Sequence, residues 1–211
     1  MPMIHRRRFA QLLAATSALF VAAPAAALAQ QSYNLFDDIP IEDKVMGDVN
    51  APVTLVEYAS MTCPHCKTFH DSVLPELKQR YVETGKLKYI LRPFPFDGDR
   101  RGEAAFMLAM CAPNDNYYPM IDALFSTQQV WGRGGNPVPE LLRISKLSGM
   151  SEDDFKACLG NQELLTNMVK GRNKAVSDFG VRATPTVFVN GQKVEETSLD
   201  AVVAAIEGAL S

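Results

Sequence analysis

The sequence predicts an α/β fold in which a small mixed sheet is interrupted by a block of helices. Three observations support this fold class. Residues 44–98 follow a strand–helix–strand order, which is the unit that builds a parallel sheet. Residues 99–178 show helical patterns and no strand pattern, and residues 179–211 show a hairpin followed by a helix. We therefore expect 44–98 and 179–211 to form one sheet domain that carries 99–178 as a helical insertion.

The first part of the sheet domain contains two predicted strands around one helix. Residues 53–59 form a compact apolar run after Pro52, and residues 87–94 form another, as expected of buried strands. Between them, Pro75 stands inside a helical pattern, where its missing amide hydrogen predicts a kink, and Gly85 ends the helix. The apolar positions of that helix are Phe69, Val73, Leu74, Leu77 and Tyr81.

The predicted insertion contains several amphipathic helices. One apolar stripe lies within 104–111, a second within 120–125 and a third within 141–147. Ser151 precedes acidic residues at 152–154, which is typical of a helix N-cap, and predicts a helix over 155–159.

The chain after the insertion predicts a hairpin and a closing helix. Residues 186–189 (Thr-Val-Phe-Val) are typical of a strand, and 192–195 form the returning strand. The dipeptide Asn190-Gly191 between them is favoured in two-residue hairpin turns. An amphipathic helix is predicted over 199–210.

The N-terminus has the pattern of an export signal. Arg6, Arg7 and Arg8 precede an uncharged stretch over 12–29, which ends in the small-residue pattern Ala27-Leu28-Ala29. We expect residues 1–29 to be a cleavable signal peptide, with general secretion and twin-arginine export both open. Residues 30–43 are polar and acidic and are expected to be a flexible lead-in.

The charge and the distribution of apolar residues argue against several classes of function. The leader holds three of the 21 basic residues and none of the 24 acidic ones, so the remaining chain carries a net charge of about −6. No basic cluster follows the leader, which argues against binding to nucleic acid or to an anionic lipid surface. No later apolar run is long enough to span a bilayer. We expect a monomeric protein in the periplasm.

An oxidising compartment changes the interpretation of the four cysteines, because thiols there tend to form disulfides. Four cysteines permit three pairings. Cys63 and Cys66 are separated by only two residues, which leaves Cys111 and Cys158 as a structural pair inside the insertion.

The sequence Cys63-Pro64-His65-Cys66 stands where a strand passes into a helix. A helix N-terminus carries partial positive charge and free amide donors, so we expect it to lower the pKa of Cys63. Pro64 suits the first helical turn, and His65 adds a donor beside the same sulfur. Stabilising the Cys63 thiolate favours the reduced pair, which makes the Cys63–Cys66 disulfide a stronger oxidant.

The Cys-Pro-His-Cys motif after a buried strand resembles the DsbA-like branch of the thioredoxin superfamily, and the resemblance covers roughly residues 44–210. It implies a thioredoxin-like fold and thiol–disulfide oxidoreductase activity. Thr184-Pro185, just before a strand, resembles the cis-proline loop of the superfamily, which would bind an extended substrate segment next to the cysteines. Some members of this branch also have such a second disulfide in the helical domain.

Glu57 lies inside an apolar strand, where a buried carboxyl group is costly without a function. The resemblance implies a proton shuttle to the buried cysteine, whereas strand alternation also allows an outward-facing residue. Lys88 on the neighbouring strand is a candidate partner for Glu57.

The resemblance implies that reduced, unfolded exported proteins are the substrates and that a DsbB-type, quinone-linked membrane oxidase regenerates the disulfide. No cofactor and no resident metal are expected. Disulfide isomerase or reductase activity and a copper-tolerance type of thioredoxin-fold protein are alternatives, because these proteins share the motif. A different class of function is a periplasmic copper- or zinc-binding protein, with Cys63, Cys66 and either Met61 or His70 as ligands. His70 completes a Cys-x2-Cys-x3-His pattern, but no fourth Cys or His lies nearby.

Overall fold

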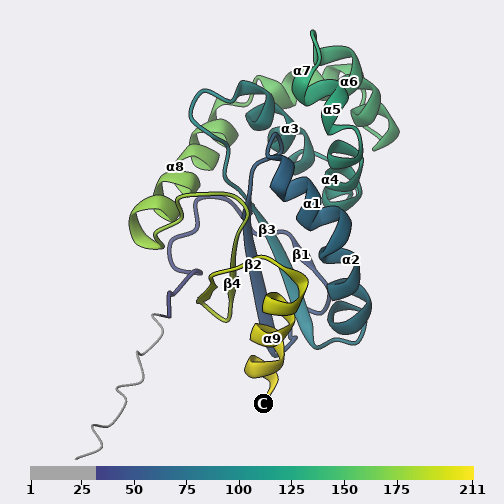
Figure 1. The fold of residues 1–211 in the computed structure, drawn as a ribbon. Helices are drawn as coiled ribbons and strands as arrows, with labels where there is room; N and C mark the ends of the chain where they lie inside the picture. Colours follow the sequence, from purple (N-terminus) through teal and green to yellow (C-terminus); the bar gives the residue numbers. More distant parts are fainter. Residues whose placement is uncertain (1–31) are drawn as a thin grey trace, which may run out of the picture.

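A mixed sheet of the order β1-β3-β2-β4-β5 forms the centre of the protein (Figure 1). A computed structural model describes residues 32–211, so the predicted leader over 1–29 lies outside the described residues. Strands β2 and β3 pair in parallel, and the other neighbouring pairs are antiparallel. The α/β fold class is therefore confirmed. The strands are β1 (Val45–Met46), β2 (Val53–Ala59), β3 (Leu87–Pro93), β4 (Thr186–Val189) and β5 (Gln192–Val194).

The two faces of the sheet pack against different helices, because side chains alternate along each strand. On one face, Leu55 and Val187 pack with residues of α1 (Pro64–Ser72), α2 (Leu74–Leu77) and α9 (Leu199–Leu210). On the other face, Val56 and Tyr58 pack with residues of α8 (Gln162–Asp178) and the segment that follows it. Helices thus cover both faces of the central strand β2 (Figure 1).

The helix after β2 is interrupted near Pro75, as its sequence predicts. Helix α1 ends at Ser72 and α2 begins at Leu74. The amide of Val73 still donates to the carbonyl of Phe69 at 2.9 Å, but Pro75 has no amide hydrogen with which to continue the ladder. A π-helical turn over Lys78–Val82 completes the segment before Gly85, whose φ of 72° suits glycine.

The stretch between β3 and β4 is helical, in agreement with the predicted insertion. Ser151 is the N-cap of α7 (Glu152–Leu159), and its hydroxyl accepts from the amide of Asp154 in a capping box. The sequence patterns did not separate α8, which is the longest helix in residues 32–211 and returns from the insertion to cover the sheet. The other helices are α3 (Arg100–Met110), α4 (Tyr117–Ser126), α5 (Gln128–Arg133), α6 (Val138–Leu147) and α7 (Glu152–Leu159).

The predicted hairpin joins β4 and β5. Asn190 and Gly191 have φ of 45° and 80°, the left-handed conformations that a type I′ turn requires. A β-carbon at Gly191 would lie 2.3 Å from the carbonyl oxygen of Tyr33. Glycine is therefore needed both for the turn and for the close approach of the N-terminal segment.

The expectation of a flexible lead-in is wrong for residues 32–43. Ser32 forms an isolated bridge with Gln192, and the amide of Tyr33 donates to the carbonyl of Gly191 at 2.8 Å. Leu35 is only 1% exposed and packs against the sheet face that α8 covers. The segment carries four acidic residues, but the burial of Leu35 anchors it.

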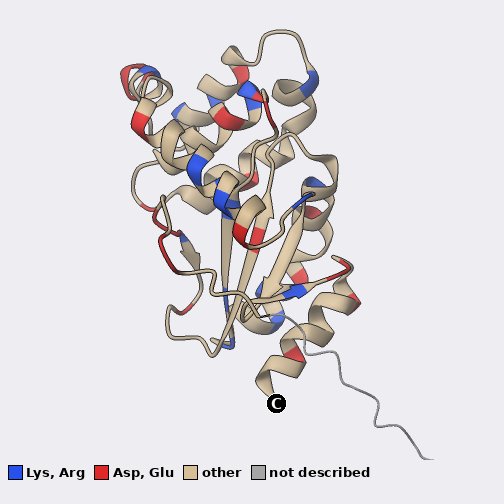
Figure 2. Ribbon diagram, turned by 90° about the vertical axis from the view of Figure 1, so that its left-hand side faces the viewer, with Lys and Arg blue, Asp and Glu red and all other residues tan. Residues whose placement is uncertain are grey.

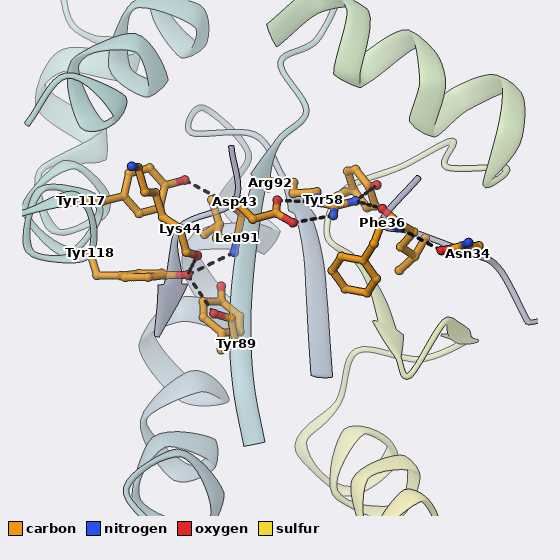
Figure 3. A network of polar contacts seen from close by, with 11 residues as sticks. Asn34, Phe36, Asp43, Lys44, Tyr58, Tyr89, Leu91, Arg92, Tyr117 and Tyr118 are labelled. Atoms are coloured by element: carbon orange, nitrogen blue, oxygen red, sulfur yellow. Dashed lines mark hydrogen bonds and ion pairs between the residues drawn. The ribbon is translucent and has the colours of Figure 1, made fainter. Parts of the chain in front are cut away.

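A buried ion pair holds the end of the same segment (Figure 3). The guanidinium of Arg92 donates to both oxygens of Asp43, at 2.7 and 2.6 Å. Its third nitrogen donates to the carbonyl of Leu35 and to the hydroxyl of Tyr58, at 2.8 and 2.9 Å. On the other side of β3 in Figure 3, the hydroxyl of Tyr118 donates to the carbonyl of Lys44 at 2.6 Å. The N-terminal segment is thus tied to both sides of β3.

Lys and Arg residues are mixed with Asp and Glu residues along the ribbon in Figure 2, and neither sign covers a whole layer. Within residues 32–211, no helix is both long enough and apolar enough to cross a membrane.

Candidate functional site

The two cysteines of the motif lie at the junction between β2 and α1. Cys63 is the N-cap of α1, with extended backbone angles, and Pro64 occupies the first turn. Cys63 and Cys66 are 4% and 0% exposed, and both are free thiols in this structure. The strand-to-helix position predicted for Cys63 is therefore present in the fold.

The surroundings of the two sulfurs separate their acidities. A hydrogen bond from the Cys66 thiol is the main cause that lowers the pKa of Cys63 to about 5. Burial opposes this effect, while Thr184 and the backbone amides of His65 and Cys66 reinforce it. Burial, followed by the interaction with Cys63, raises the pKa of Cys66 far above its usual range. Cys63 is thus the sulfur that exists as a thiolate, and Cys66 is the sulfur that holds a proton.

The loop around Pro185 comes next to Cys63 in space. The Thr184–Pro185 peptide bond is cis, and β4 begins at the following residue. As a thiol, Cys63 donates to the carbonyl of Thr184 at 3.3 Å. The hydroxyl of Thr184 is buried without a partner in the described chain, so it is available to donate once Cys63 is a thiolate.

Glu57 is buried beneath the motif and is 1% exposed. It lies on β2 between Leu55 and Ala59, on the face covered by α1 and α9. The hydroxyl of Tyr89 donates to one carboxyl oxygen at 2.5 Å, and the other oxygen has no partner in residues 32–211. Burial raises the pKa of Glu57 to about 8, the Tyr89 hydrogen bond opposes this effect and the nearby Cys63 adds to it. The carboxyl group is therefore mostly protonated at neutral pH.

The proposed pairing of Glu57 with Lys88 is wrong. The ammonium group of Lys88 donates to the carbonyl of Val49 at 2.9 Å. Successive side chains of a strand point to opposite faces, so Tyr89 reaches Glu57 and Lys88 does not.

The two histidines near the motif have different surroundings. His65 is exposed, and its contribution to the low pKa of Cys63 comes through its backbone amide. His70 lies one turn further along α1, and its Nε2 is 2.8 Å from a carboxyl oxygen of Asp122 on α4. Within residues 32–211, no three His, Cys, Asp or Glu side chains are grouped so that they would hold a metal ion.

Two contacts from the helical block reach the motif loop, and the sequence analysis identified neither. The side-chain amide of Gln128 on α5 donates to the carbonyls of Met61 and Cys63, at 2.8 and 3.0 Å. The hydroxyl of Thr62 donates to Asp99, whose carboxylate also caps α3. Nothing in the local sequence around Gln128 indicates that its side chain binds the backbone of a residue 65 positions earlier.

The second pair of cysteines lies away from the motif. A disulfide joins Cys111, at the end of α3, to Cys158 on α7, with a Cα–Cα distance of 6.2 Å. Both residues belong to the helical block, so this bond links two of its helices.

Comparisons with known proteins place this geometry in a family. The family model described as Thioredoxin matches residues 41–208. A Rickettsia bellii protein, named as a candidate protein-disulfide oxidoreductase, is 32% identical over 169 residues, which cover 80% of this chain and 64% of the relative. This chain thus spans less than two thirds of that relative's length.

Solved structures show the same fold. The crystal structure of Wolbachia pipientis alpha-DsbA1 is 32% identical, with a TM-score of 0.73, and the match covers 80% of this chain and 90% of that one. The structure of oxidised BdbD from Bacillus subtilis has a TM-score of 0.72 at 21% identity and covers 80% and 92% of the two chains, which supports the fold alone. The chain therefore belongs to the thioredoxin family, within its DsbA-like branch.

Proposed function

We propose that this protein introduces disulfides into exported proteins by thiol–disulfide exchange at Cys63 and Cys66. The observation that carries the proposal is the unequal acidity of the two sulfurs. With a pKa of about 5, Cys63 is roughly 99% thiolate at pH 7. A stabilised thiolate favours the reduced pair over the disulfide, so the Cys63–Cys66 disulfide tends to take electrons from substrate thiols.

The exchange proceeds in two displacements. A thiolate of the reduced substrate attacks the sulfur of Cys63, which forms a mixed disulfide and releases the sulfur of Cys66. The leaving sulfur takes a proton, for which the protonated carboxyl of Glu57 is the proposed donor. A second substrate thiolate then attacks the substrate sulfur of the mixed disulfide and releases Cys63 as a thiolate. The substrate loses two electrons to the cysteine pair.

The loop at Pro185 is the proposed binding site for the substrate backbone. Thr184 is buried beside Cys63, and β4 begins at Thr186, two residues later. A substrate segment lying along Thr184 would place its cysteine within reach of Cys63, in the manner of an added strand.

Export to the periplasm, a monomeric state and reoxidation by a DsbB-type, quinone-linked membrane partner complete the proposal. The leader pattern over residues 1–29 supports export. N-terminal sequencing of the protein recovered from the periplasm tests it. A chain that begins at Gln30 is expected, and a retained leader contradicts the proposed cleavage.

Two ribonuclease assays test the direction of exchange. Oxidation of reduced ribonuclease is expected to be fast and to require both cysteines, whereas rearrangement of scrambled ribonuclease is expected to be slow. Efficient rearrangement with poor oxidation would instead show an isomerase. Titration in glutathione buffers, with a metal assay on the same sample, separates both from a copper- or zinc-binding protein.

Single cysteine variants test the two roles. Cys63→Ser is expected to abolish turnover, because no thiolate remains to form the mixed disulfide. Cys66→Ser is expected to trap mixed disulfides with exported proteins that already hold a disulfide, because the Cys63 thiolate attacks that disulfide and no Cys66 thiol is present to release the substrate. Trapping through Cys66 in the Cys63→Ser variant would reverse the assignment.

A further inference from the structure

The side chain of Gln128 connects the helical block to the loop that carries Cys63. Gln128 is the first residue of α5 and is 1% exposed. Its amide nitrogen lies 2.8 Å from the carbonyl oxygen of Met61 and 3.0 Å from that of Cys63. One side chain thus binds the backbone on both sides of Thr62, immediately before α1.

Both donors of the Gln128 amide are used, which determines its orientation. The two N–H groups have one carbonyl each, whereas the buried oxygen has no partner in residues 32–211. Reversing the amide would place that oxygen against two carbonyl oxygens, where it would be repelled. The positive end of the amide dipole therefore points at the loop, and an unpaired buried oxygen is tolerated to keep it there.

Helix α5 is itself held in place, so Gln128 is a fixed donor. The guanidinium of Arg101 on α3 binds the carboxyl end of α5. The indole of Trp131 is fully buried and donates to the carbonyl of Leu124 at 2.8 Å. The carbonyl oxygens that accept from Arg101, at 2.7 to 3.2 Å, belong to Trp131, Gly132, Gly134 and Gly135.

The two carbonyls that Gln128 binds lie next to the Cys63 sulfur in the chain. Carbonyl oxygens carry partial negative charge, and those of Met61 and Cys63 flank the sulfur along the chain. The carbonyl of Cys63 also accepts from the amide of Lys67 at 3.2 Å, as the first hydrogen bond of α1. Gln128 keeps both oxygens directed toward itself, and it keeps Cys63 in the N-cap geometry that presents the amides of α1 to the sulfur.

We propose that Gln128 is a positioning residue for the Cys63 thiolate, through which the helical block controls the reactivity of the site. The residue touches no substrate and acts through the backbone of Met61 and Cys63. The inference rests on the proposed function, because it assigns a role within the same exchange reaction.

The test is the pH dependence of Cys63 alkylation by iodoacetamide in the reduced protein. Gln128→Met keeps the length of the side chain and removes both donors. We expect a higher apparent pKa of Cys63 and alkylation at pH 5 that is roughly 3- to 10-fold slower, the factor that corresponds to the loss of one or two hydrogen bonds. Gln129→Met, at the exposed neighbouring position, is the matched control and is expected to behave like the wild type.

Gln128→Asn gives an independent measurement if Gln128→Met does not fold. Its amide is one methylene too short to reach both carbonyls, so the same direction of change is expected. A lower melting temperature with an unchanged alkylation profile in the folded variants overturns the inference, because it shows a merely structural residue. An ordinary cysteine profile in the wild type overturns the proposed function itself, and that result does not depend on any variant.

Discussion

Substitution of Glu57 by glutamine is expected to change how stability depends on pH. Burial raises the pKa of this carboxyl from its ordinary value of 4.5 to about 8 in the folded protein. Between these two values the folded protein holds a proton that the unfolded chain has released. The free energy of unfolding of the wild type therefore falls as the pH rises through this window. The substituted glutamine side chain would be neutral at every pH and would still accept the hydrogen bond of Tyr89.

The size of the effect follows from the two pKa values. At 1.36 kcal/mol for each pKa unit, the window from 4.5 to about 8 corresponds to about 5 kcal/mol. This value is an upper limit, because water and nearby dipoles reorganise around a buried charge. We expect Glu57→Gln to match the wild type within about 1 kcal/mol at pH 5. At pH 8.5 we expect the variant to be more stable by about 2 to 5 kcal/mol.

Urea denaturation of the oxidised proteins at several pH values measures this difference. Closing the Cys63–Cys66 disulfide removes the titration of both thiols, and subtracting the two profiles cancels the other groups. Glu83→Gln, at an exposed position, is the control and is expected to follow the wild type. Parallel profiles for the wild type and Glu57→Gln would refute the raised pKa and, with it, the proton-donor role proposed for Glu57.

Three further predictions concern the N-terminal segment and the helical block. Arg92→Met leaves the nearly buried carboxylate of Asp43 without its partner. We expect the free energy of unfolding, measured by urea denaturation, to fall by about 3–5 kcal/mol and to recover partly when Asp43→Asn is added. A single variant as stable as the wild type would contradict the buried pair. Leu35→Ala is expected to lower the free energy of unfolding by about 2–5 kcal/mol, because Leu35 is buried. If the N-terminal segment were loose, the substitution would leave the free energy of unfolding almost unchanged. Replacing Cys111 and Cys158 by alanine opens a long loop and is expected to cost about 4 kcal/mol in the chain-entropy model, measured by thermal unfolding, and an unchanged melting temperature would contradict it.

Much of the fold was predictable because local patterns and tertiary packing agree. The apolar run of β2 predicts a strand buried on both faces, and the helices packed on the two faces of the sheet bury it in that way. The turn at Asn190-Gly191 and the cap at Ser151 are likewise local chemistry. The N-terminal segment was not predictable, because one buried leucine and one buried ion pair outweigh its polar composition.

In the functional site, too, some features follow from the local sequence and others from tertiary packing. The motif predicts a thiolate at Cys63, because a strand-to-helix junction presents amides to the sulfur whatever lies elsewhere in the chain. Which side chains complete the site depends on distant elements. Glu57 binds Tyr89 rather than Lys88, and Gln128 approaches from the helical block.

By itself, the sequence determined the α/β class, the strand-to-helix position of the reactive sulfur and the helical character of the insertion. These features follow from side-chain periodicity and backbone propensity, which act over a few residues. Only the tertiary structure decided which face of β2 carries Glu57, what Gln128 binds and how residues 32–43 pack. A buried hydrogen bond joins groups that can be more than sixty residues apart, and its geometry exists only once the elements have packed together.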